Sequence, residues 1–367
     1  FKQKTAYEIS TRDWSSDVCS SDLYICLCFI LRICLTISVC CQTTHQFAKI
    51  LIINQMNAVI FYLIHIADSF VHNDTFVLSV CLFIVILHAN NNLVMSEYLS
   101  TKKKKVTAPT FIKMKQDGEK IAMLTAYDYT TATIIDSAGV DCILIGDSAS
   151  NVMAGNENTI PITVDQMIYH ARAVARAVSH ALVLCDMPFG SYQVSREEGV
   201  RNAIKIMKES GADAVKLEGG IEIIETVKAI IAAGIPVCGH LGLTPQSVHK
   251  FGGYGLRAKE QAEAEKLISD AEALDKAGCF AIVLEKVPAE LAALITKKVH
   301  CATIGIGAGN GTDGQVLVYA DMLGMNQGFR PKFLRQYADL YSVITDAVGH
   351  YVDDVKSSSF PNASESY

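Results

Sequence analysis

The sequence predicts an α/β protein of the (β/α)8, or TIM, barrel class, with a helix covering the N-terminal end of the barrel and another helix at the C-terminus. From about residue 120 onward, short apolar runs alternate with amphipathic segments at the spacing of βα units. Five of the apolar runs also end in a polar residue that is able to do chemistry; they read CILIGDS (142–148), LVLCDMP (182–188), AVKLEGG (214–220), PVCGHLG (236–242) and AIVLEKVP (281–288).

Short apolar runs bounded by Gly and Pro are typical of the buried strands of a parallel sheet. The segment 110–120 comes first and is predicted to be a short amphipathic helix over the N-terminal end of the barrel. The predicted strands follow in the order 121–127, 142–148, 182–188, 214–220, 236–242, 281–288, 303–309 and, on a weaker signal, 326–330.

The segments between these strands have helical periodicity and signals for helix ends. Thr163 is a candidate N-cap, Ser195 and Glu198 form a candidate capping box, and Gly211 is placed to end a helix. A doubly wound open sheet is the alternative fold, but the chain lacks a Gly-rich dinucleotide fingerprint after its first strand. The predicted helices are near 129–138, then 163–178, 195–211, 221–233, 258–277, 289–299 and near 312–323, with a C-terminal helix over 333–355.

Residues 1–94 differ in composition from residues 95–367. They hold 7 of the 12 cysteines, at positions 19, 26, 28, 34, 40, 41 and 81, and the only Trp. The opening residues resemble a translated sequencing-adapter fragment, and the following stretch is typical of AT-rich noncoding DNA read in frame. We interpret residues 1–94 as a gene-model artefact and 95–367 as a single catalytic barrel domain. If residues 24–89 are real, the apolar run 24–41 would be a borderline membrane span.

Composition excludes several classes of function. A formal net charge of −6 and a sequence pI near 5.9 leave no basic surface for nucleic acid. The five cysteines after residue 94 form no CxxC pair, so neither a zinc site nor a disulfide framework is predicted. Such scattered thiols are typical of a reducing, cytoplasmic compartment. We therefore expect a cytoplasmic enzyme that binds small molecules and contacts neither nucleic acid nor membrane.

The polar ends of the predicted strands are expected to meet on one face, where the active sites of barrel enzymes lie. Asp147, Asp186 and Glu218 would then share a pocket, and three carboxylates repel one another unless a cation lies among them. Oxygen ligands without Cys or His favour Mg²⁺ over Zn²⁺. Each acid alone is equally well read as a helix cap or an ion-pair partner, but acids in successive units favour a metal site.

Four further residues are candidates for contact with a substrate. Lys216 shares a strand face with Glu218 and suits a substrate carboxylate or a developing enolate, although a Schiff base or a structural ion pair would also use it. Glu285 comes from further round the barrel and suits a general base. His240 is either a hydrogen-bonding partner of the substrate or a buried core histidine, and Ser148 could bind through its hydroxyl or its backbone N–H.

Two Gly-rich segments lie close to these residues. The long segment 240–257 contains Pro245 and is typical of a lid over an active site. The string GIGAGN (305–310) either cradles an anion through backbone N–H groups or lets a helix pack closely against a strand.

Taken together, the motifs resemble those of the ketopantoate hydroxymethyltransferase family. The match runs in order from about residue 110 to 361, leaves out residues 1–94, and is highly specific because HLGLTPQSV occurs within the ordered set. The matching strings are MLTAYDY (123–129), GDS (146–148), DMPFGSY (186–192), KLEGG (216–220), VCGHLGLTPQSV (237–248), FGGY (251–254), LEKVP (284–288) and IGIGAGNGTDGQVLV (304–318).

The resemblance implies an enzyme that transfers a hydroxymethyl group from 5,10-methylenetetrahydrofolate to 3-methyl-2-oxobutanoate, giving 2-dehydropantoate. It implies Mg²⁺ as the metal and a homo-oligomer, with a decamer as the candidate size. One departure is Ala149-Ser150-Asn151 in place of Leu-Gly-Met, which puts the local contacts of that loop in doubt. The residue roles it implies are metal ligands Asp147, Asp186 and Glu218, substrate contacts Asp147, Ser148, Asp186 and Lys216, and the base Glu285.

The sequence leaves two alternative functions. A Mg²⁺-dependent keto-acid lyase or mutase barrel of the phosphoenolpyruvate mutase and isocitrate lyase type uses similar chemistry, but its typical catalytic Cys loop is not found here. A membrane-anchored binding protein would rest wholly on residues 24–89 being real.

Overall fold

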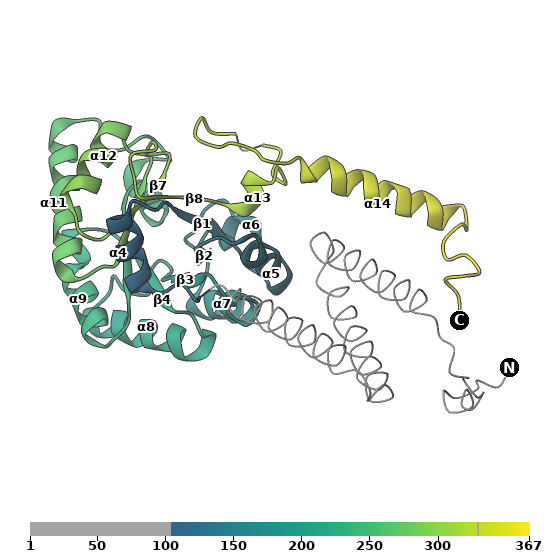
Figure 1. Ribbon diagram of the computed structural model, residues 1–367, viewed down its shortest axis with the longest axis horizontal. Helices are drawn as coiled ribbons and strands as arrows, with labels where there is room; N and C mark the ends of the chain where they lie inside the picture. Colours follow the sequence, from purple (N-terminus) through teal and green to yellow (C-terminus); the bar gives the residue numbers. More distant parts are fainter. Residues whose placement is uncertain (1–103, 329) are drawn as a thin grey trace, which may run out of the picture. The chain divides into compact units, whose positions relative to one another are not determined.

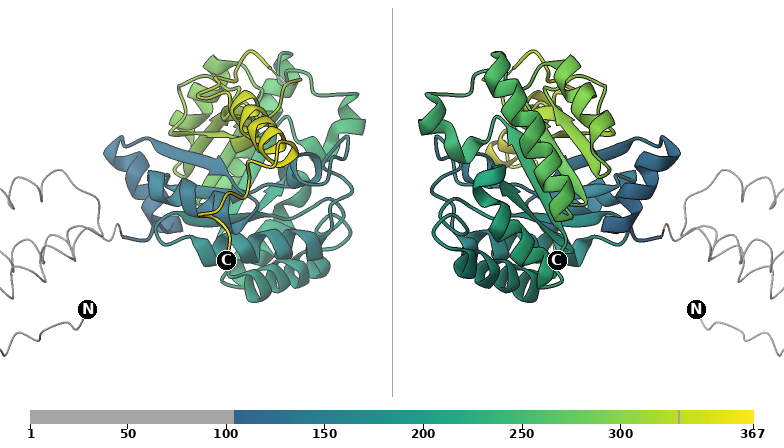
Figure 2. Two further views of the ribbon diagram at one scale, coloured as in Figure 1. Left: turned by 90° about the vertical axis from the view of Figure 1, so that its right-hand side faces the viewer. Right: turned by 90° about the vertical axis from the view of Figure 1, so that its left-hand side faces the viewer.

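The computed structural model describes residues 104–328 and 330–367, in which eight parallel strands form the centre of the molecule (Figure 1). The strands pair in chain order and β1 also pairs with β8, so the sheet closes into a barrel. Helices surround the barrel on its outer side (Figure 2). The predicted (β/α)8 class is confirmed.

The strands are short and almost wholly buried, as parallel strands covered by helices should be. Their bounds are β1 Ile121–Thr125, β2 Cys142–Ile145, β3 Leu182–Asp186, β4 Ala214–Glu218, β5 Val237–Gly242, β6 Ala281–Glu285, β7 Ala302–Ile306 and β8 Gly314–Leu317.

The main helices begin and end where the sequence signals indicate. Thr163 accepts a hydrogen bond from Gln166 N and forms a capping box with that residue, and Ser195 accepts one from Glu198 N. Gly211 ends its helix in the left-handed region, with φ 79°. The helices are α4 Ala108–Asp117, α5 Tyr129–Ala138, α6 Ala149–Val152, α7 Val164–Ala177, α8 Arg196–Ser210, η1 Ile221–Ile223, α9 Ile224–Ala232, η2 Pro245–Ser247, α10 Val248–Phe251, α11 Gln261–Ala277, α12 Ala289–Lys298, α13 Tyr319–Met322 and α14 Leu340–Lys356.

Helix α4 closes the N-terminal end of the barrel, as predicted. Phe111 is fully buried, and its ring meets that of Phe280 edge-on with centroids 5.3 Å apart. Phe280 directly precedes β6, so this contact lies at the start of the strands. Lys115 adds a polar clamp, since its Nζ donates to Thr296 O at 2.8 Å and to Cys301 O at 2.8 Å. With this end sealed, the C-terminal ends of the strands are the face left for a site.

The prediction for the last βα unit is wrong. A helix near 312–323 and a strand near 326–330 are predicted, whereas residues 314–317 form β8 and only the four-residue α13 follows. A parallel crossover normally needs a dozen or more residues, but here the loop 307–313 joins β7 directly to β8. Gly314 allows the tight fit, because a Cβ there would lie 2.5 Å from Ile121 O.

The C-terminal helix begins later than predicted. Helix α14 starts at Leu340, after Asp339, whose carboxylate accepts from Ser342 N at 3.3 Å. Residues 333–339 instead form an irregular segment, and its residues Phe333 and Leu334 line the cavity described below.

The predictions made for residues 1–94 fall outside the described residues. Between residues 104 and 367, leaving out 329, none of the helices combines the length and apolar character needed to cross a bilayer. The five cysteines in this part of the chain are buried and free.

Asp136 ties helix α5 to the segment that leads into β3. Its carboxylate accepts from Ser179 N at 2.8 Å, Ser179 Oγ at 2.9 Å and Ala181 N at 2.8 Å. Burial would raise the pKa of Asp136, but these donors outweigh burial and lower it. The charged form is therefore more stable in the folded protein than in the unfolded chain.

We predict that Asp136→Asn lowers the free energy of unfolding by about 1–3 kcal/mol at pH 7, because the amide presents an N–H group to backbone donors. A depressed pKa gives stability that is present at neutral pH and lost as the pH falls below the usual range of an Asp. The difference between the variant and the wild type should therefore shrink towards pH 3.5 in urea titrations. Asp353→Asn, on the exposed α14, is the control, and a difference independent of pH would contradict the account.

Candidate active site

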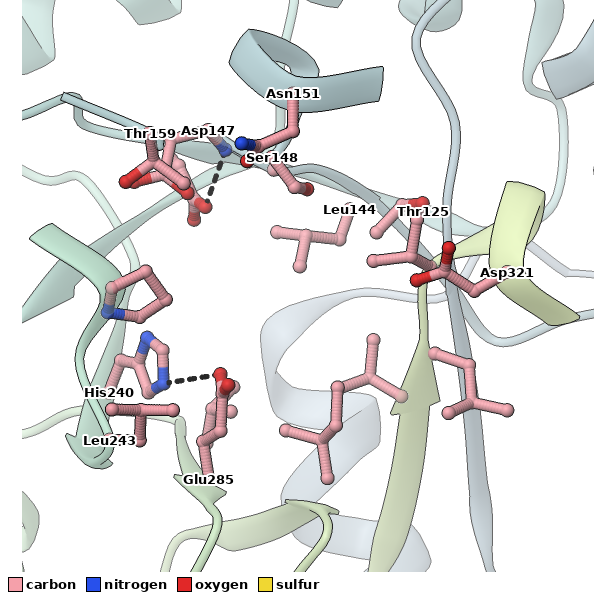
Figure 3. Close-up of a pocket in the computed structure, with 18 of the residues that line it drawn as sticks. Thr125, Leu144, Asp147, Ser148, Asn151, Thr159, His240, Leu243, Glu285 and Asp321 are labelled. Atoms are coloured by element: carbon pink, nitrogen blue, oxygen red, sulfur yellow. Dashed lines mark hydrogen bonds and ion pairs between the residues drawn. The ribbon is translucent and has the colours of Figure 1, made fainter. Parts of the chain in front are cut away.

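The C-terminal ends of the strands open into one cavity of about 500 Å³ (Figure 3). The structure brings together in its wall every residue that the sequence singled out, namely Asp147, Ser148, Asp186, Lys216, Glu218, His240 and Glu285.

Strand register explains how these side chains meet. Asp186 pairs with Lys216 between β3 and β4, and Glu218 pairs with His240 between β4 and β5. Because side chains alternate along a strand, Lys216 and Glu218 point to the same side of β4. Glu285 is the last residue of β6, next to β5. The adjacent strands β3 to β6 thus place their own acidic and basic side chains next to one another, and no loop is needed to position them.

Lys216 is a buried cation surrounded by acids. Its Nζ lies 2.8 Å from Asp186 Oδ1, and only 3% of the residue is exposed. Burial alone would lower the pKa of Lys216, but the carboxylates of Asp186, Glu218 and Asp147 outweigh burial and raise it. Lys216 is therefore a fixed positive charge at neutral pH. This disfavours the Schiff-base reading, which needs a neutral amine.

His240 lies between two glutamates. Its Nδ1 is 3.2 Å from Glu218 Oε1, and its Nε2 is 3.4 Å from Glu285 Oε2. Burial and the charge of Lys216 lower the pKa of His240, but the two glutamates outweigh them and raise it to about 9. The imidazole is thus charged at neutral pH and belongs to the ionic network of the cavity. Figure 3 shows its contact with Glu285.

The three clustered carboxylates are suited to a hard divalent cation. Burial, followed by repulsion from Glu218 and Asp186, raises the pKa of Asp147 well above its usual range. Asp186 Oδ1 and Glu218 Oε1 are buried oxygens that receive no hydrogen bond of normal geometry. Carboxylate oxygens that lack a hydrogen bond are available as ligands for Mg²⁺.

The carboxylates do not yet enclose a common point. Among residues 104–328 and 330–367, no three His, Cys, Asp or Glu side chains converge closely enough to hold an ion. Asp186 and Glu218 instead face Lys216 and His240, while Asp186 Oδ2 accepts from Asp147 N at 3.0 Å. A bound cation would need these side chains to turn towards a common point.

Gln246 joins the acids to the segment after β5, and the sequence reading missed this residue. Its Nε2 donates to Asp147 Oδ2 at 3.0 Å and to Met187 O at 3.0 Å, and its backbone N donates to Glu218 Oε2 at 3.0 Å. Its Oε1 accepts from Tyr192 OH at 2.7 Å. A buried amide with all its groups paired fixes the position of the acids that it contacts.

Gln246 and Tyr192 carried a signal only in the family strings, since both lie within them. A lone Gln or Tyr has no spacing pattern of its own, so periodicity does not find it.

Ser148 is held by a second buried tyrosine. Tyr127 OH lies 2.7 Å from Ser148 Oγ. Directly after Ser148, residues 149–152 form the short helix α6, which no pattern predicted. Ala149 and Ser150 there are buried, and Ser150 Oγ donates to Asn158 O at 2.7 Å. The residues that depart from the family pattern therefore make well-packed local contacts.

For one of the two Gly-rich segments the structure favours one of the predicted roles, and for the other it leaves the role open. In GIGAGN, a Cβ at Gly309 would lie 2.5 Å from Ala289 Cβ, so this loop packs closely against α12, which supports the packing interpretation over the anion cradle. The segment 240–257 contains η2 and α10, and the half-exposed Tyr254 reaches the cavity from it. Its role as a lid stays a prediction.

The wall of the cavity also has an apolar part. This part includes apolar residues of the β7 and β8 region and of the segment after α13, which are Ile306, Val316, Leu317, Val318, Phe333 and Leu334. One acid lies there, Asp321 of α13, which is 8% exposed and accepts from Asn326 Nδ2 at 2.6 Å. The sequence reading missed Asp321 because it placed this residue in a longer helix.

Comparison with known proteins gives a consistent result. The model of the ketopantoate hydroxymethyltransferase family matches residues 105–363. The chain is 63% identical over 273 residues to a 3-methyl-2-oxobutanoate hydroxymethyltransferase of Bacteroides fragilis, covering 74% of this chain and 100% of that protein. With the enzyme of the same name from Flavobacterium johnsoniae it is 63% identical over 272 residues, covering 73% of this chain and 100% of that protein.

Among solved structures, phosphonopyruvate hydrolase aligns with a TM-score of 0.46 at 11% identity, over 71% of this chain and 93% of its own. The match to the family model and the two enzymes spans the whole barrel and every residue of the cavity wall discussed above. The chain belongs to the ketopantoate hydroxymethyltransferase family.

Proposed function

We propose that the protein transfers a hydroxymethyl group from 5,10-methylenetetrahydrofolate to 3-methyl-2-oxobutanoate, giving 2-dehydropantoate in the first step of pantothenate synthesis. The family relationship supports this reaction. The observation that carries it is the fixed charge of Lys216 among buried carboxylates, with Glu285 in the wall of the same cavity. An anionic keto acid needs a cation at its carboxylate and a base near the carbon beside its ketone.

We assign Mg²⁺ binding to Asp147, Asp186 and Glu218, the last directly or through a water molecule. When bound, Mg²⁺ would polarise the keto oxygen as a Lewis acid. Lys216 would neutralise the substrate carboxylate, and the Ser148 hydroxyl, held by Tyr127, would orient it. Asp147 and Asp186 complete the proposed substrate contacts. The buried oxygens of Asp186 and Glu218 that lack a hydrogen bond support this arrangement.

Glu285 is the proposed general base. Its carboxylate is attracted to the charged His240, which orients one oxygen and leaves the other for a proton. In the proposed step Glu285 takes the proton from the third carbon of the keto acid, and the electron pair of that C–H bond forms an enolate that Lys216 helps to stabilise. The third carbon then bonds to the one-carbon unit of the folate. The two C–N bonds that held this carbon to the folate break, and water supplies the hydroxyl oxygen. One proton from water and the proton held by Glu285 go to the two nitrogens, and tetrahydrofolate leaves.

We also propose that the protein is a homo-oligomer, with a decamer as the candidate size. Support comes from α14, none of whose residues is buried although it carries Ile344, Val348, Tyr351 and Val355 at helical spacing. An apolar stripe of this kind is normally covered. Strand β8 is followed by only the four-residue α13, so the outer ring has room for a helix from a second copy.

We predict that Glu285→Gln keeps the affinity for 3-methyl-2-oxobutanoate within a few-fold but lowers kcat by at least about 10²-fold, because the amide accepts no proton. Calorimetric titration of the keto acid and a direct assay of 2-dehydropantoate measure the two quantities. Glu260→Gln, at an exposed position before α11, is the matched control. Near-normal turnover in Glu285→Gln would remove Glu285 from the role of base.

We predict that Gln246→Met weakens the binding of Mn²⁺, used as a spectroscopic substitute for Mg²⁺, by about 10–100-fold, because Asp147 and Glu218 lose the partner that orients them. Electron paramagnetic resonance of free Mn²⁺ gives the affinity without any need for turnover. Gln261→Met, on the exposed start of α11, is the control. Unchanged Mn²⁺ affinity in a folded Gln246→Met protein would show that Gln246 does not position the acids.

We predict that Val348→Asp reduces the mass measured by analytical ultracentrifugation, since a charge in a covered apolar stripe is unfavourable. His350→Asp, on the opposite face of the same helix, should leave the mass unchanged. A monomeric wild-type protein would contradict the proposed assembly.

A further inference from the structure

The cavity has two sides of opposite character, which suggests that it takes two different ligands. On one side are the cations Lys216 and His240 with their acids. Figure 3 shows Asp321 and Thr125 on the opposite side from His240 and Glu285. A small branched keto acid held by Lys216 would fill only part of a space of about 500 Å³. The rest of the wall includes apolar side chains and Asp321, together with polar residues such as Thr125 and Asn326.

Asp321 is unusual because it is a buried acid without a cation. Among the described residues, no Lys, Arg or His forms an ion pair with it, and Asn326 is the one side chain that donates to its carboxyl group. Only Oδ1 is engaged by Asn326, so Oδ2 has no donor from this part of the chain. This oxygen is not one of the enclosed side-chain atoms that lack a partner, so it is open to the cavity and can accept from a ligand. An uncharged side chain could also accept the hydrogen bond from Asn326, so this contact alone does not explain an acid at position 321.

The charge of Asp321 restricts the ligand that this side can take. An anionic keto acid would be repelled by the carboxylate and attracted by Lys216 on the other side. Asp321 therefore suits a neutral ligand that offers N–H donors, and the apolar walls suit a flat ring. A 2-amino-4-oxopyrimidine edge has these properties, because its ring N–H and its exocyclic amine lie side by side and point in the same direction. Two parallel donors match the two oxygens of one carboxylate.

We infer that Asp321 binds the aminopyrimidinone edge of the folate co-substrate and so sets the specificity of the cavity for a pterin one-carbon donor. This inference rests on the proposed function, which supplies the folate. The fused ring would lie between the apolar walls, with its reactive one-carbon unit directed towards the keto acid and Glu285. Asp321 would act by binding and orientation and would exchange no proton in the reaction.

The test compares Asp321→Asn with the wild type, using tetrahydrofolate and an analogue that lacks the 2-amino group. The amide keeps the shape but replaces one acceptor by a donor that faces the donors of the ligand. We expect tetrahydrofolate to bind about 10–100-fold more weakly to Asp321→Asn in calorimetry, as for the loss of hydrogen bonds to a charged group. The affinity for 3-methyl-2-oxobutanoate should be unchanged, which also shows that the variant is folded.

The analogue separates recognition from a structural role. The wild type should prefer tetrahydrofolate over the 2-deamino analogue, and Asp321→Asn should lose that preference. If Asp321 only supported the segment around Asn326, both ligands would weaken equally and the preference would persist, which would overturn the inference. Asp339→Asn, at the start of α14 and outside the cavity wall, is the control for removing a nearby charge.

The outcome is distinguishable from a failure of the proposed function. A wild type that makes 2-dehydropantoate while Asp321→Asn binds tetrahydrofolate normally would overturn only the assignment of Asp321. A wild type that makes no 2-dehydropantoate and binds no tetrahydrofolate would overturn both.

Discussion

The charged cavity of this barrel depends on the buried cation of Lys216. Lys216 lies in the interior with 3% exposure, and an isolated ammonium there would be destabilised by several kcal/mol. Asp186, Asp147 and Glu218 offset that penalty, and they in turn would repel one another without Lys216. The three carboxylates and the Lys216 ammonium therefore stabilise one another in the folded protein. The parallel register of β3, β4 and β5 holds Asp186, Lys216 and Glu218 close together. A shift of one residue in any of these strands would turn its charged side chains to the other face.

The rest of the structure holds this network in place. Helix α4 seals the opposite end of the barrel, so the charged side chains have a single opening. Gln246 links the segment after β5 to Asp147 and Glu218, and Tyr192 fixes Gln246 in turn. Asp321 and several apolar side chains lie in the wall of the same cavity, where the proposed second ligand would meet the keto acid.

Much of the fold, and the charged half of the site, could be predicted from the sequence. Apolar runs ending in Asp147, Asp186, Glu218 and Glu285 are a strong local signal because strand burial and strand-end chemistry are both local. The last strand was missed because β8 is four residues long, begins with a Gly and follows a loop without a helix. Gln246 and Asp321 were missed for a different reason. Gln246 makes hydrogen bonds across the fold from η2, and Asp321 reaches the cavity wall from a four-residue helix, and no periodicity encodes either position.

The central claim is that this ionic cavity removes a proton from the third carbon of a bound keto acid. The most direct measurement is proton NMR of 3-methyl-2-oxobutanoate in deuterated water, with the protein present and with no folate, as Mg²⁺ is added. The account predicts that the signal of the third-carbon proton disappears at a rate that depends on both protein and Mg²⁺. A folded protein that binds the keto acid in the presence of Mg²⁺ and leaves that signal unchanged would contradict it.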